Sequence, residues 1–170
     1  MINLTVEKLT NVKLPCKAHK TDAGIDFYMP ESLEYVLAGG KGIKVSLADK
    51  VVNGETIKTL ALYIEPHESV LIPMGVKLSF NNDYAMVFFN RSGTASKKHL
   101  FRGACVVDSG YTGQLFLNLT NVSNETQYLF PGEKLIQGLL LPVPEVDIEE
   151  GKVDIHTDRG ECGFGSTDHK

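Results

Sequence analysis

One segment places a carboxylate at a glycine-flanked turn. Asp108 follows the apolar pair Val106-Val107, and Gly110 and Tyr111 come soon after it. Such a carboxylate can take a proton from water, because apolar surroundings would raise its proton affinity, and Tyr111 offers a flat face for a sugar or base. The alternative is a plain Asp-Ser-Gly turn in which Asp108 accepts hydrogen bonds from backbone N–H groups. The segment alone leaves both interpretations open.

A second segment places an arginine between an apolar run and a stretch that can form a helical turn. Arg91, Ser92 and Gly93 follow the apolar residues 86–89 and lead into residues 94–100. A hydroxyl and exposed N–H groups at the start of a helix can donate to phosphate. The alternative is a surface turn in which Ser92 is the N-cap, and this segment alone favours that alternative.

The C-terminal tail holds a third group of side chains suited to a nucleotide. Arg159 can make forked contacts to phosphate, Phe164 can stack on a base, and residues 165–167 (Gly-Ser-Thr) offer closely spaced donors. A stretch so rich in glycine cannot build a core. We therefore expect a mobile arm that a ligand orders, or else a flexible solubilising tail.

The elements that must position these residues read as strands. Apolar residues alternate with polar ones in five runs: Ile2 to Val6, Val70 to Ile72, Val76 to Phe80, Met86 to Phe88, and Leu115 to Leu119. Glycine, proline and asparagine separate the runs at short intervals. Many short strands between turns predict an all-β sandwich or barrel.

One region stands apart from this pattern. Residues of about 33–62 contain Asn53-Gly54, a pair that tolerates the positive φ angles of a tight hairpin turn. We expect an inserted hairpin-like segment there. The predicted organisation is a single domain over residues 1–144 that includes this insertion, followed by a mobile arm over residues 145–170 with the glycine-rich end.

Composition excludes several classes of function. The 170 residues carry a net charge of −4, which disfavours nucleic acid as a partner. Cys16, Cys105 and Cys162 are far apart and have no zinc-ligand spacing, and the five histidines form no i, i+4 pair. No signal-peptide block or membrane-spanning run is present, so the chain is expected to be soluble and cytoplasmic.

Taken in order, five segments resemble the five motifs of the trimeric dUTP pyrophosphatase (dUTPase) family. They are residues 23–26 (AGID), 91–93 (RSG), 106–113 (VVDSGYTG), 131–137 (PGEKLIQ) and 159–167 (RGECGFGST). Each is a weak pattern alone, but five in order are a specific signal. The resemblance covers most of the chain except about 33–62, where compact members have a shorter connection.

The resemblance implies a distorted jelly roll of the β-clip type and a homotrimer whose active sites each draw residues from all three chains. The implied reaction is hydrolysis of dUTP to dUMP and pyrophosphate. Asp108 would be the base that draws a proton from the water attacking the α-phosphorus. Tyr111 would pack under the deoxyribose and leave no room for a 2′-hydroxyl.

The resemblance assigns the other site residues by their motifs. Uracil would be read by the backbone of Cys105, Val106 and Val107, and the phosphate chain would be held by Arg91, Ser92, Gly93 and Gln137. The β- and γ-phosphates would be clamped by Arg159, Gly165, Ser166 and Thr167, with Phe164 over the base. Mg²⁺ would be carried by phosphate oxygens and waters, with Asp26 as an outer-sphere partner through water.

Four positions depart from the family pattern. Cys105 and Cys162 stand where the family usually has glycine, Gly110 replaces a common acidic residue, and Asp168 replaces a terminal glycine. Cys105 lies close to the expected uracil contact, and Asp168 adds a negative charge beside the expected γ-phosphate clamp.

The sequence leaves two other functions to compare with this one. A dCTP deaminase of the same fold commonly needs a glutamate near the third motif, and residues 103–107 contain no acidic residue. A regulatory binding protein on this scaffold could use the insertion at 33–62 to dock a protein partner. A dead-enzyme version would be expected to lose Asp108, Tyr111 or Phe164, and all three are present.

Overall fold

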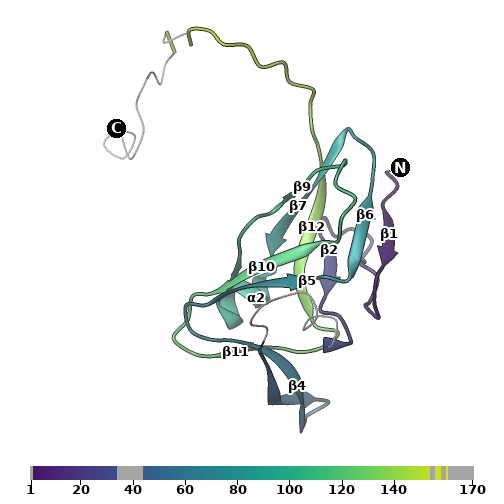
Figure 1. Cartoon of the computed structure of the whole chain (residues 1–170), viewed down its shortest axis with the longest axis vertical. Helices are drawn as coiled ribbons and strands as arrows, with labels where there is room; N and C mark the ends of the chain where they lie inside the picture. Colours follow the sequence, from purple (N-terminus) through teal and green to yellow (C-terminus); the bar gives the residue numbers. More distant parts are fainter. Residues whose placement is uncertain (1, 34–43, 154–155, 158–159, 161–170) are drawn as a thin grey trace.

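The computed structural model describes residues 2–33, 44–153, 156–157 and 160. Within this part the chain folds into strands with one short helix, which confirms the prediction of an all-β protein (Figure 1). The strands are β1 (Thr5–Lys8), β2 (Ile25–Tyr28), β3 (Lys44–Val52), β4 (Glu55–Ile64), β5 (Ser69–Pro73), β6 (Val76–Ser79), β7 (Tyr84–Asn90), β8 (Leu100–Arg102), β9 (Val106–Val107), β10 (Phe116–Asn121), β11 (Gln127–Leu129) and β12 (Lys134–Pro142). The helix is α2 (Ser92–Lys98).

The strands form four small sheets. Their orders are β2-β12-β7-β9, β5-β10-β8, β11-β4-β3 and β1-β6, and every recorded pairing is antiparallel. Strands far apart in the sequence are neighbours, as β2 is of β12. Residues from both ends of the chain therefore meet on the first sheet.

A single apolar core joins the sheets. On β10 the buried side chains alternate with more exposed ones, with Leu117 and Leu119 inward, as the period-two pattern predicts. Phe27 of β2 and Phe88 of β7 meet edge to face at a centroid distance of 4.9 Å. Burying each such ring contributes about 1.5–3 kcal/mol, so Phe27 anchors β2 firmly and fixes its neighbour Asp26.

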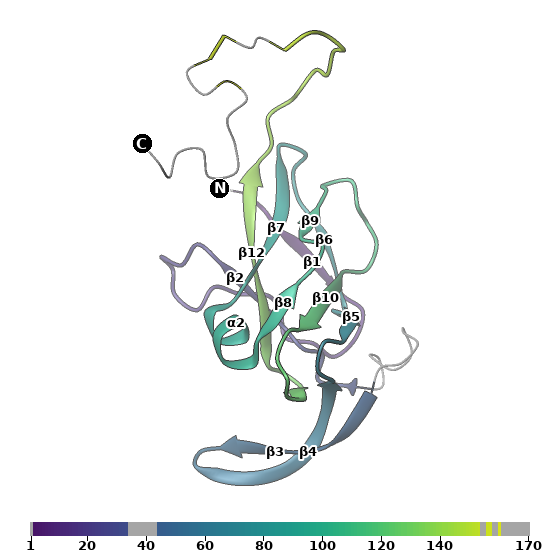
Figure 2. The same ribbon diagram turned by 90° about the vertical axis from the view of Figure 1, so that its left-hand side faces the viewer.

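The segment with the Asn-Gly pair forms a long hairpin of β3 and β4 that projects from the body (Figure 2). Asn53 and Gly54 have φ of 53° and 86°, which confirms the predicted tight turn. The inner end of β4 belongs to the core, because Leu62 and Ile64 are fully buried and pair with β11. Among the residues assigned to the insertion, Leu62 therefore also supports the body.

Two element boundaries differ from the sequence prediction. The predicted strand at Ile2 to Val6 begins only at Thr5, and Ile2 is exposed. The predicted helical stretch at 94–100 lies two residues earlier, because His99 ends α2 in the left-handed conformation and Leu100 starts β8.

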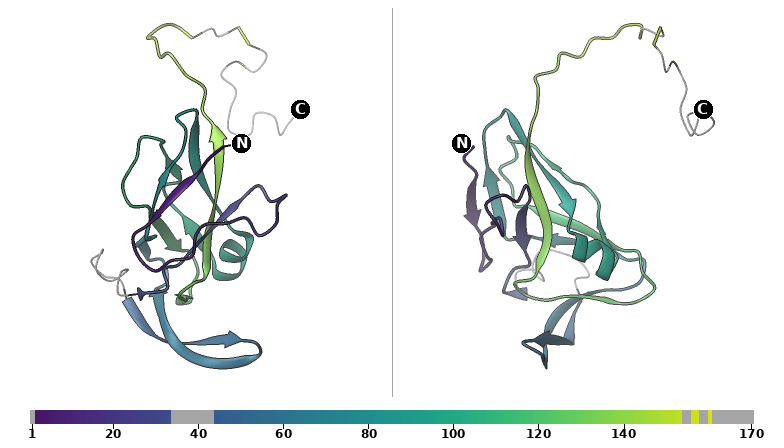
Figure 3. Two further views of the ribbon diagram at one scale, coloured as in Figure 1. Left: turned by 90° about the vertical axis from the view of Figure 1, so that its right-hand side faces the viewer. Right: turned by 180° about the vertical axis from the view of Figure 1, so that it is seen from behind.

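After β12 the chain leaves the body as an extended segment (Figure 3). Residues 143–153 are exposed and form no strand or helix. In the described part of the chain, no helix is long and apolar enough to span a bilayer.

Candidate active site

An ion cluster joins three of the segments that resemble motifs. Arg91 Nε donates to Asp26 Oδ1 at 2.8 Å, and Lys134 Nζ lies 2.6 Å from Asp26 Oδ2. The Asp26 side chain is 11% exposed, whereas those of Arg91 and Lys134 are 30% and 35% exposed. A nearly buried carboxylate therefore holds two cations at the surface.

A β-bulge brings Lys134 into this cluster. In the pairing of β12 with β2, Gln137 lies opposite Asp26 and Ile136 opposite Phe27, but Lys134 rather than Leu135 lies opposite Tyr28. Lys134 and Gln137 are three residues apart and would point to opposite faces of a regular strand. The extra residue turns both side chains to the face of Asp26. Lys134 was missed as a site residue, because the bulge has no signal in the sequence.

Gln137 is held by its amide group. Its Nε2 donates to the carbonyl of Asn90 at 2.9 Å. A Cβ added at Gly24 would lie 2.5 Å from Gln137 Oε1, closer than real Cβ atoms approach. A side chain at position 24 would therefore displace the Gln137 amide from this position.

The start of α2 corrects the alternative interpretation of Ser92. The N-cap is Arg91, with no side-chain cap hydrogen bond, and Ser92 is the first helical residue. Ser92 is exposed, so its hydroxyl is available to a ligand. The buried Thr94 hydroxyl donates to the Leu135 carbonyl at 3.1 Å and fastens α2 to β12.

These residues line a hollow of about 450 Å³. Its walls are Ala18, His19, Asp22, Ala23, Gly24, Asp26, Arg91, Ser92, Lys134 and Gln137. The predicted residues Asp26, Arg91, Ser92 and Gln137 are therefore brought together. The lining combines two cations and two carboxylates with the Ser92 hydroxyl, and Arg91, Lys134 and Ser92 can donate to a phosphate.

One rim of the hollow is the loop before β2. His19 N donates to Asp22 Oδ2 at 2.9 Å, and this backbone hydrogen bond, followed by the His19 side chain, lowers the pKa of Asp22. Neither residue was predicted to belong to the site: His19 forms no i, i+4 pair with another histidine, and Asp22 lies just before the segment 23–26.

The base of the same loop is tied to β2. Cys16 and Asp26 exchange two backbone hydrogen bonds of 3.2 and 2.8 Å, and Cys16 Sγ lies 3.1 Å from the Tyr28 hydroxyl. Burial, together with the neighbouring Cys16, raises the pKa of Tyr28 to about 12. These contacts fix the loop over the ion cluster.

Asp108 and Tyr111 lie in a different place. Asp108 directly follows β9, and its side chain is exposed. The apolar surroundings expected for this carboxylate are thus not provided by one chain alone. Tyr111 N donates to the Asp108 carbonyl at 3.1 Å and closes the turn between them.

Within a single chain, Asp108 lies far from the ion cluster. Val107 pairs with Met86 near the start of β7, whereas Asn90 at the other end of β7 pairs with Ile136 beside the hollow. At about 3.3 Å per residue, the position opposite Asp108 lies roughly 17 Å from Asn90 along β7. A general base must lie within hydrogen-bond reach of its proton or one water away. Within one chain, Asp108 and the hollow therefore lie near opposite ends of β7.

The strand before Asp108 has a free edge. β9 is the last strand of its sheet, and β7 is the one neighbour recorded for it among the described residues. Val106 is 60% exposed, and the Cys105 carbonyl accepts a hydrogen bond from Phe88 N at 2.8 Å. The outer edge of Val106 and Val107 can therefore present backbone groups to a flat ligand.

The predicted residues of the fifth segment lie outside the described part. These are Arg159, Phe164, Gly165, Ser166 and Thr167. Among the described residues, no group of three His, Cys, Asp or Glu side chains could hold a metal ion.

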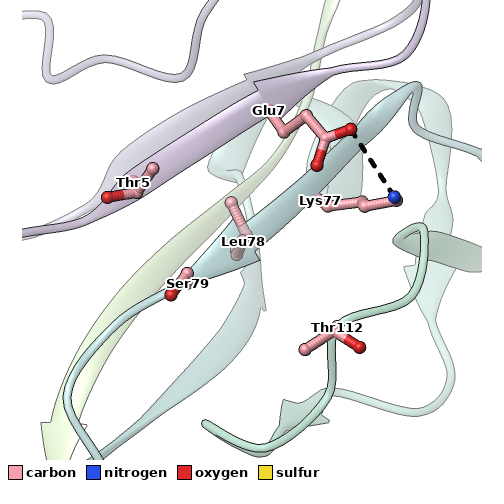
Figure 4. A pocket seen from close by; sticks show the side chains of 6 residues that line it. All are labelled: Thr5, Glu7, Lys77, Leu78, Ser79 and Thr112. Atoms are coloured by element: carbon pink, nitrogen blue, oxygen red, sulfur yellow. Dashed lines mark ion pairs between the residues drawn. The ribbon is translucent and has the colours of Figure 1, made fainter.

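A second hollow, of about 310 Å³, lies beside the β1–β6 ribbon (Figure 4). Glu7 and Lys77 pair across it at 3.5 Å, and Thr112 reaches it from the loop after β9. It contains none of the residues predicted to bind phosphate. The first hollow is the better candidate for an anionic substrate.

The chain is similar to known proteins in sequence. A family model described as dUTPase matches residues 57–168. A deoxyuridine 5′-triphosphate nucleotidohydrolase of Acinetobacter baylyi is 36% identical over 113 residues, which are 65% of this chain and 75% of that protein.

Two solved structures share the fold. A mutant dUTPase of Staphylococcus bacteriophage 80alpha with dUpNHpp has a TM-score of 0.73 and 23% identity, and the match covers 97% of this chain and 98% of that one. A mutant dUTPase from phage phi11 of S. aureus, which reveals the coordination of a structural Mg(II) ion, has a TM-score of 0.67 and 22% identity, covering 89% and 98%. This likeness confirms the predicted jelly-roll fold.

Proposed function

The chain belongs to the dUTPase family and hydrolyses dUTP to dUMP and pyrophosphate, and we propose how its own residues perform this reaction. The observation that carries the proposal is the hollow around Asp26, Arg91, Ser92 and Gln137. Three segments separated by long stretches of sequence supply these side chains, and all three resemble family motifs.

The hollow holds the phosphate chain. Arg91 and Lys134 share the carboxylate of Asp26, with Asp22 on the rim, and both cations keep N–H groups that can donate to phosphate. The exposed hydroxyl of Ser92, the backbone at Gly93 and the second N–H of the Gln137 amide add neutral donors. Asp26 keeps both cations in place before substrate arrives, which lowers the ordering cost of binding.

Asp108 is the general base. Its carboxylate takes a proton from a water molecule as the water oxygen forms a bond to the α-phosphorus. The bond from the α-phosphorus to the bridging oxygen of the β-phosphate breaks, and pyrophosphate leaves with that oxygen. Tyr111 packs under the deoxyribose, and the free edge of Cys105, Val106 and Val107 reads uracil through backbone groups.

Mg²⁺ is carried by the substrate. An ion held by phosphate oxygens and water needs no cluster of protein ligands. Asp26 fits an outer-sphere role, because each of its oxygens has one cation partner and keeps a lone pair for a water. Bound there, the ion would neutralise charge on the triphosphate.

Each active site is shared between chains of a homotrimer. The separation of roughly 17 Å along β7 supports this, because it puts Asp108 far from a phosphate bound in the hollow of the same chain. Arg159 and residues 165–167 of the fifth segment close over the β- and γ-phosphates, and Phe164 covers the base. We also propose a cytoplasmic location, where free nucleotides are available. A protein partner at the 33–62 insertion stays a prediction from the sequence.

Pyrophosphate release from a panel of nucleotides tests the proposed function. With Mg²⁺, the protein should release pyrophosphate from dUTP far faster than from dCTP, dTTP or UTP. Ammonia and dUTP formed from dCTP would instead indicate a deaminase. No turnover of any nucleotide, with dUTP binding retained, would indicate a regulatory protein on this scaffold.

A further inference from the structure

The Tyr111 ring is folded back onto its own loop. Tyr111 Oη donates to the carbonyl of Gln114 at 2.7 Å, and Tyr111 N donates to the carbonyl of Asp108 at 3.1 Å. Both ends of the residue are thus held by the loop that joins β9 to β10. The side chain is nevertheless 44% exposed, so one face of the ring is open to a ligand.

Gly113 lies directly against the ring. A Cβ added at Gly113 would lie 2.5 Å from Tyr111 Oη, 2.6 Å from Cζ and 2.9 Å from Cε2. Real Cβ atoms essentially never come within 3.0 Å of another heavy atom. The ring could not keep its position above any residue larger than glycine.

The backbone conformation at position 113 does not explain why this residue is glycine. The glycines described with a left-handed φ are Gly54, Gly75, Gly132 and Gly160, and Gly113 is not among them. An alanine could therefore adopt the backbone at position 113 without strain. What position 113 requires is empty space under the tyrosine ring.

We infer that Gly113 is a positioning residue for sugar discrimination, acting through Tyr111. This inference rests on the proposed function, in which the Tyr111 ring packs under the deoxyribose. The missing side chain lets the ring lie close to the loop, at a height where a 2′-deoxyribose fits and a 2′-hydroxyl meets the ring. A Cβ at position 113 displaces the ring, and the half-exposed side chain can move without disturbing the core.

The expected signature is a change in specificity at constant stability. Gly113→Ala should lower the ratio of kcat/KM for dUTP to that for UTP by about tenfold or more, since enzymes discriminate between substrates by such differences in transition-state binding. Its urea unfolding midpoint should match that of the wild type. Gly110→Ala is the matched control, because Gly110 lies in the same loop and a Cβ there meets nothing within 4 Å.

A double-mutant cycle shows whether the effect runs through the ring. Tyr111→Ala alone should relax the preference for dUTP, and Gly113→Ala should have no further effect in that background. If Gly113→Ala does not fold, the double variant should fold, because its Cβ meets no ring. An unfolded double variant would contradict the inference.

The ring can also be observed without turnover. In ligand-free protein with ¹³C-labelled tyrosine, Gly113→Ala should shift one ring resonance, which Tyr111→Phe identifies, whereas Gly110→Ala should not. The inference is overturned if Gly113→Ala keeps the dUTP preference, if Gly110→Ala changes it equally, or if Tyr111→Ala leaves it intact. A wild type that fails to hydrolyse dUTP would refute the proposed function, and the resonance shift would still test the contact.

Discussion

Arg91 Nε lies 2.8 Å from Asp26 Oδ1, although the two residues are 65 positions apart in the sequence. With Lys134 on the other oxygen, Asp26 organises the cationic wall of the hollow. Asp26→Asn keeps the shape of the side chain but removes the charge that both cations share. We expect the variant to lose about 1–3 kcal/mol of unfolding free energy, the usual effect of depriving hydrogen-bonded charged groups of a partner.

Urea unfolding measures this loss, and a second ion pair provides the control. Asp49 and Lys58 pair at 3.0 Å on the exposed hairpin, with side chains 59% and 72% exposed. Asp49→Asn should cost about 0.5 kcal/mol or less, because exposed pairs contribute little. Equal losses in the two variants would show that the Asp26 cluster has no special structural role.

Apart from its inner end, the projecting hairpin is expected to be dispensable for turnover. Ser46 lies opposite Ala61, so a two-residue turn can replace residues 47–60 and keep the core part of β4. No wall residue of the hollow lies in this segment, and we expect dUTP turnover within a few-fold of wild type. A folded variant that loses most activity would show that the hairpin contributes to the site.

The wider replacement of residues 33–62 serves as the comparison. It removes the buried side chains of Leu33 and Leu62, which are 7% and 0% exposed. Loss of a large buried side chain costs about 2–5 kcal/mol, so this variant should be clearly destabilised in urea. The two replacements together locate the boundary between the insertion and the body.

The end of the chain is expected to serve catalysis rather than folding. Residues 143–153 are exposed, and the described core contains no residue beyond β12. Deletion of residues 161–170 should therefore leave the unfolding midpoint unchanged and largely abolish turnover, because Phe164 and the phosphate clamp are lost. A non-hydrolysable dUTP analogue should protect this segment from limited proteolysis in the full chain. Full activity of the truncated protein would refute a role in closure.

Sharing of the active site between chains can be tested by complementation. Asp108→Asn disables the base, and the double change of Ser92 and Gln137 to alanine disables the phosphate hollow. Mixed trimers refolded from equal amounts should recover about a quarter of wild-type activity, because a quarter of sites receive both intact halves. Each variant alone should be inactive. No recovery in mixed trimers would place both halves of a site in one chain.

Much of the fold could be predicted from local patterns. The alternation in Leu115 to Leu119 became β10, and Asn53-Gly54 became the hairpin turn, because both depend on neighbouring residues. The sequence prediction placed the inner end of β4 in the insertion, whereas in the structure this end belongs to the core. Its pairing with β11 joins residues more than 60 positions apart, which the local pattern does not contain.

The site could be predicted in part. Asp26, Arg91, Ser92 and Gln137 meet in one hollow, as the order of the segments implied. Lys134 was missed because its direction depends on a bulge in β12, and Gly113 because its role depends on where one ring lies. The exposure of Asp108 was not expected, since an apolar run precedes it but does not cover it.

Turnover of dUTP by Asp108→Asn tests the central claim most directly. The asparagine keeps the size and much of the hydrogen bonding of Asp108 but cannot take a proton. We predict that Asp108→Asn binds a non-hydrolysable dUTP analogue with unchanged affinity, while its pyrophosphate release from dUTP with Mg²⁺ falls by roughly 10²-fold or more. Near-normal pyrophosphate release by this variant would contradict the assignment of Asp108 as the base.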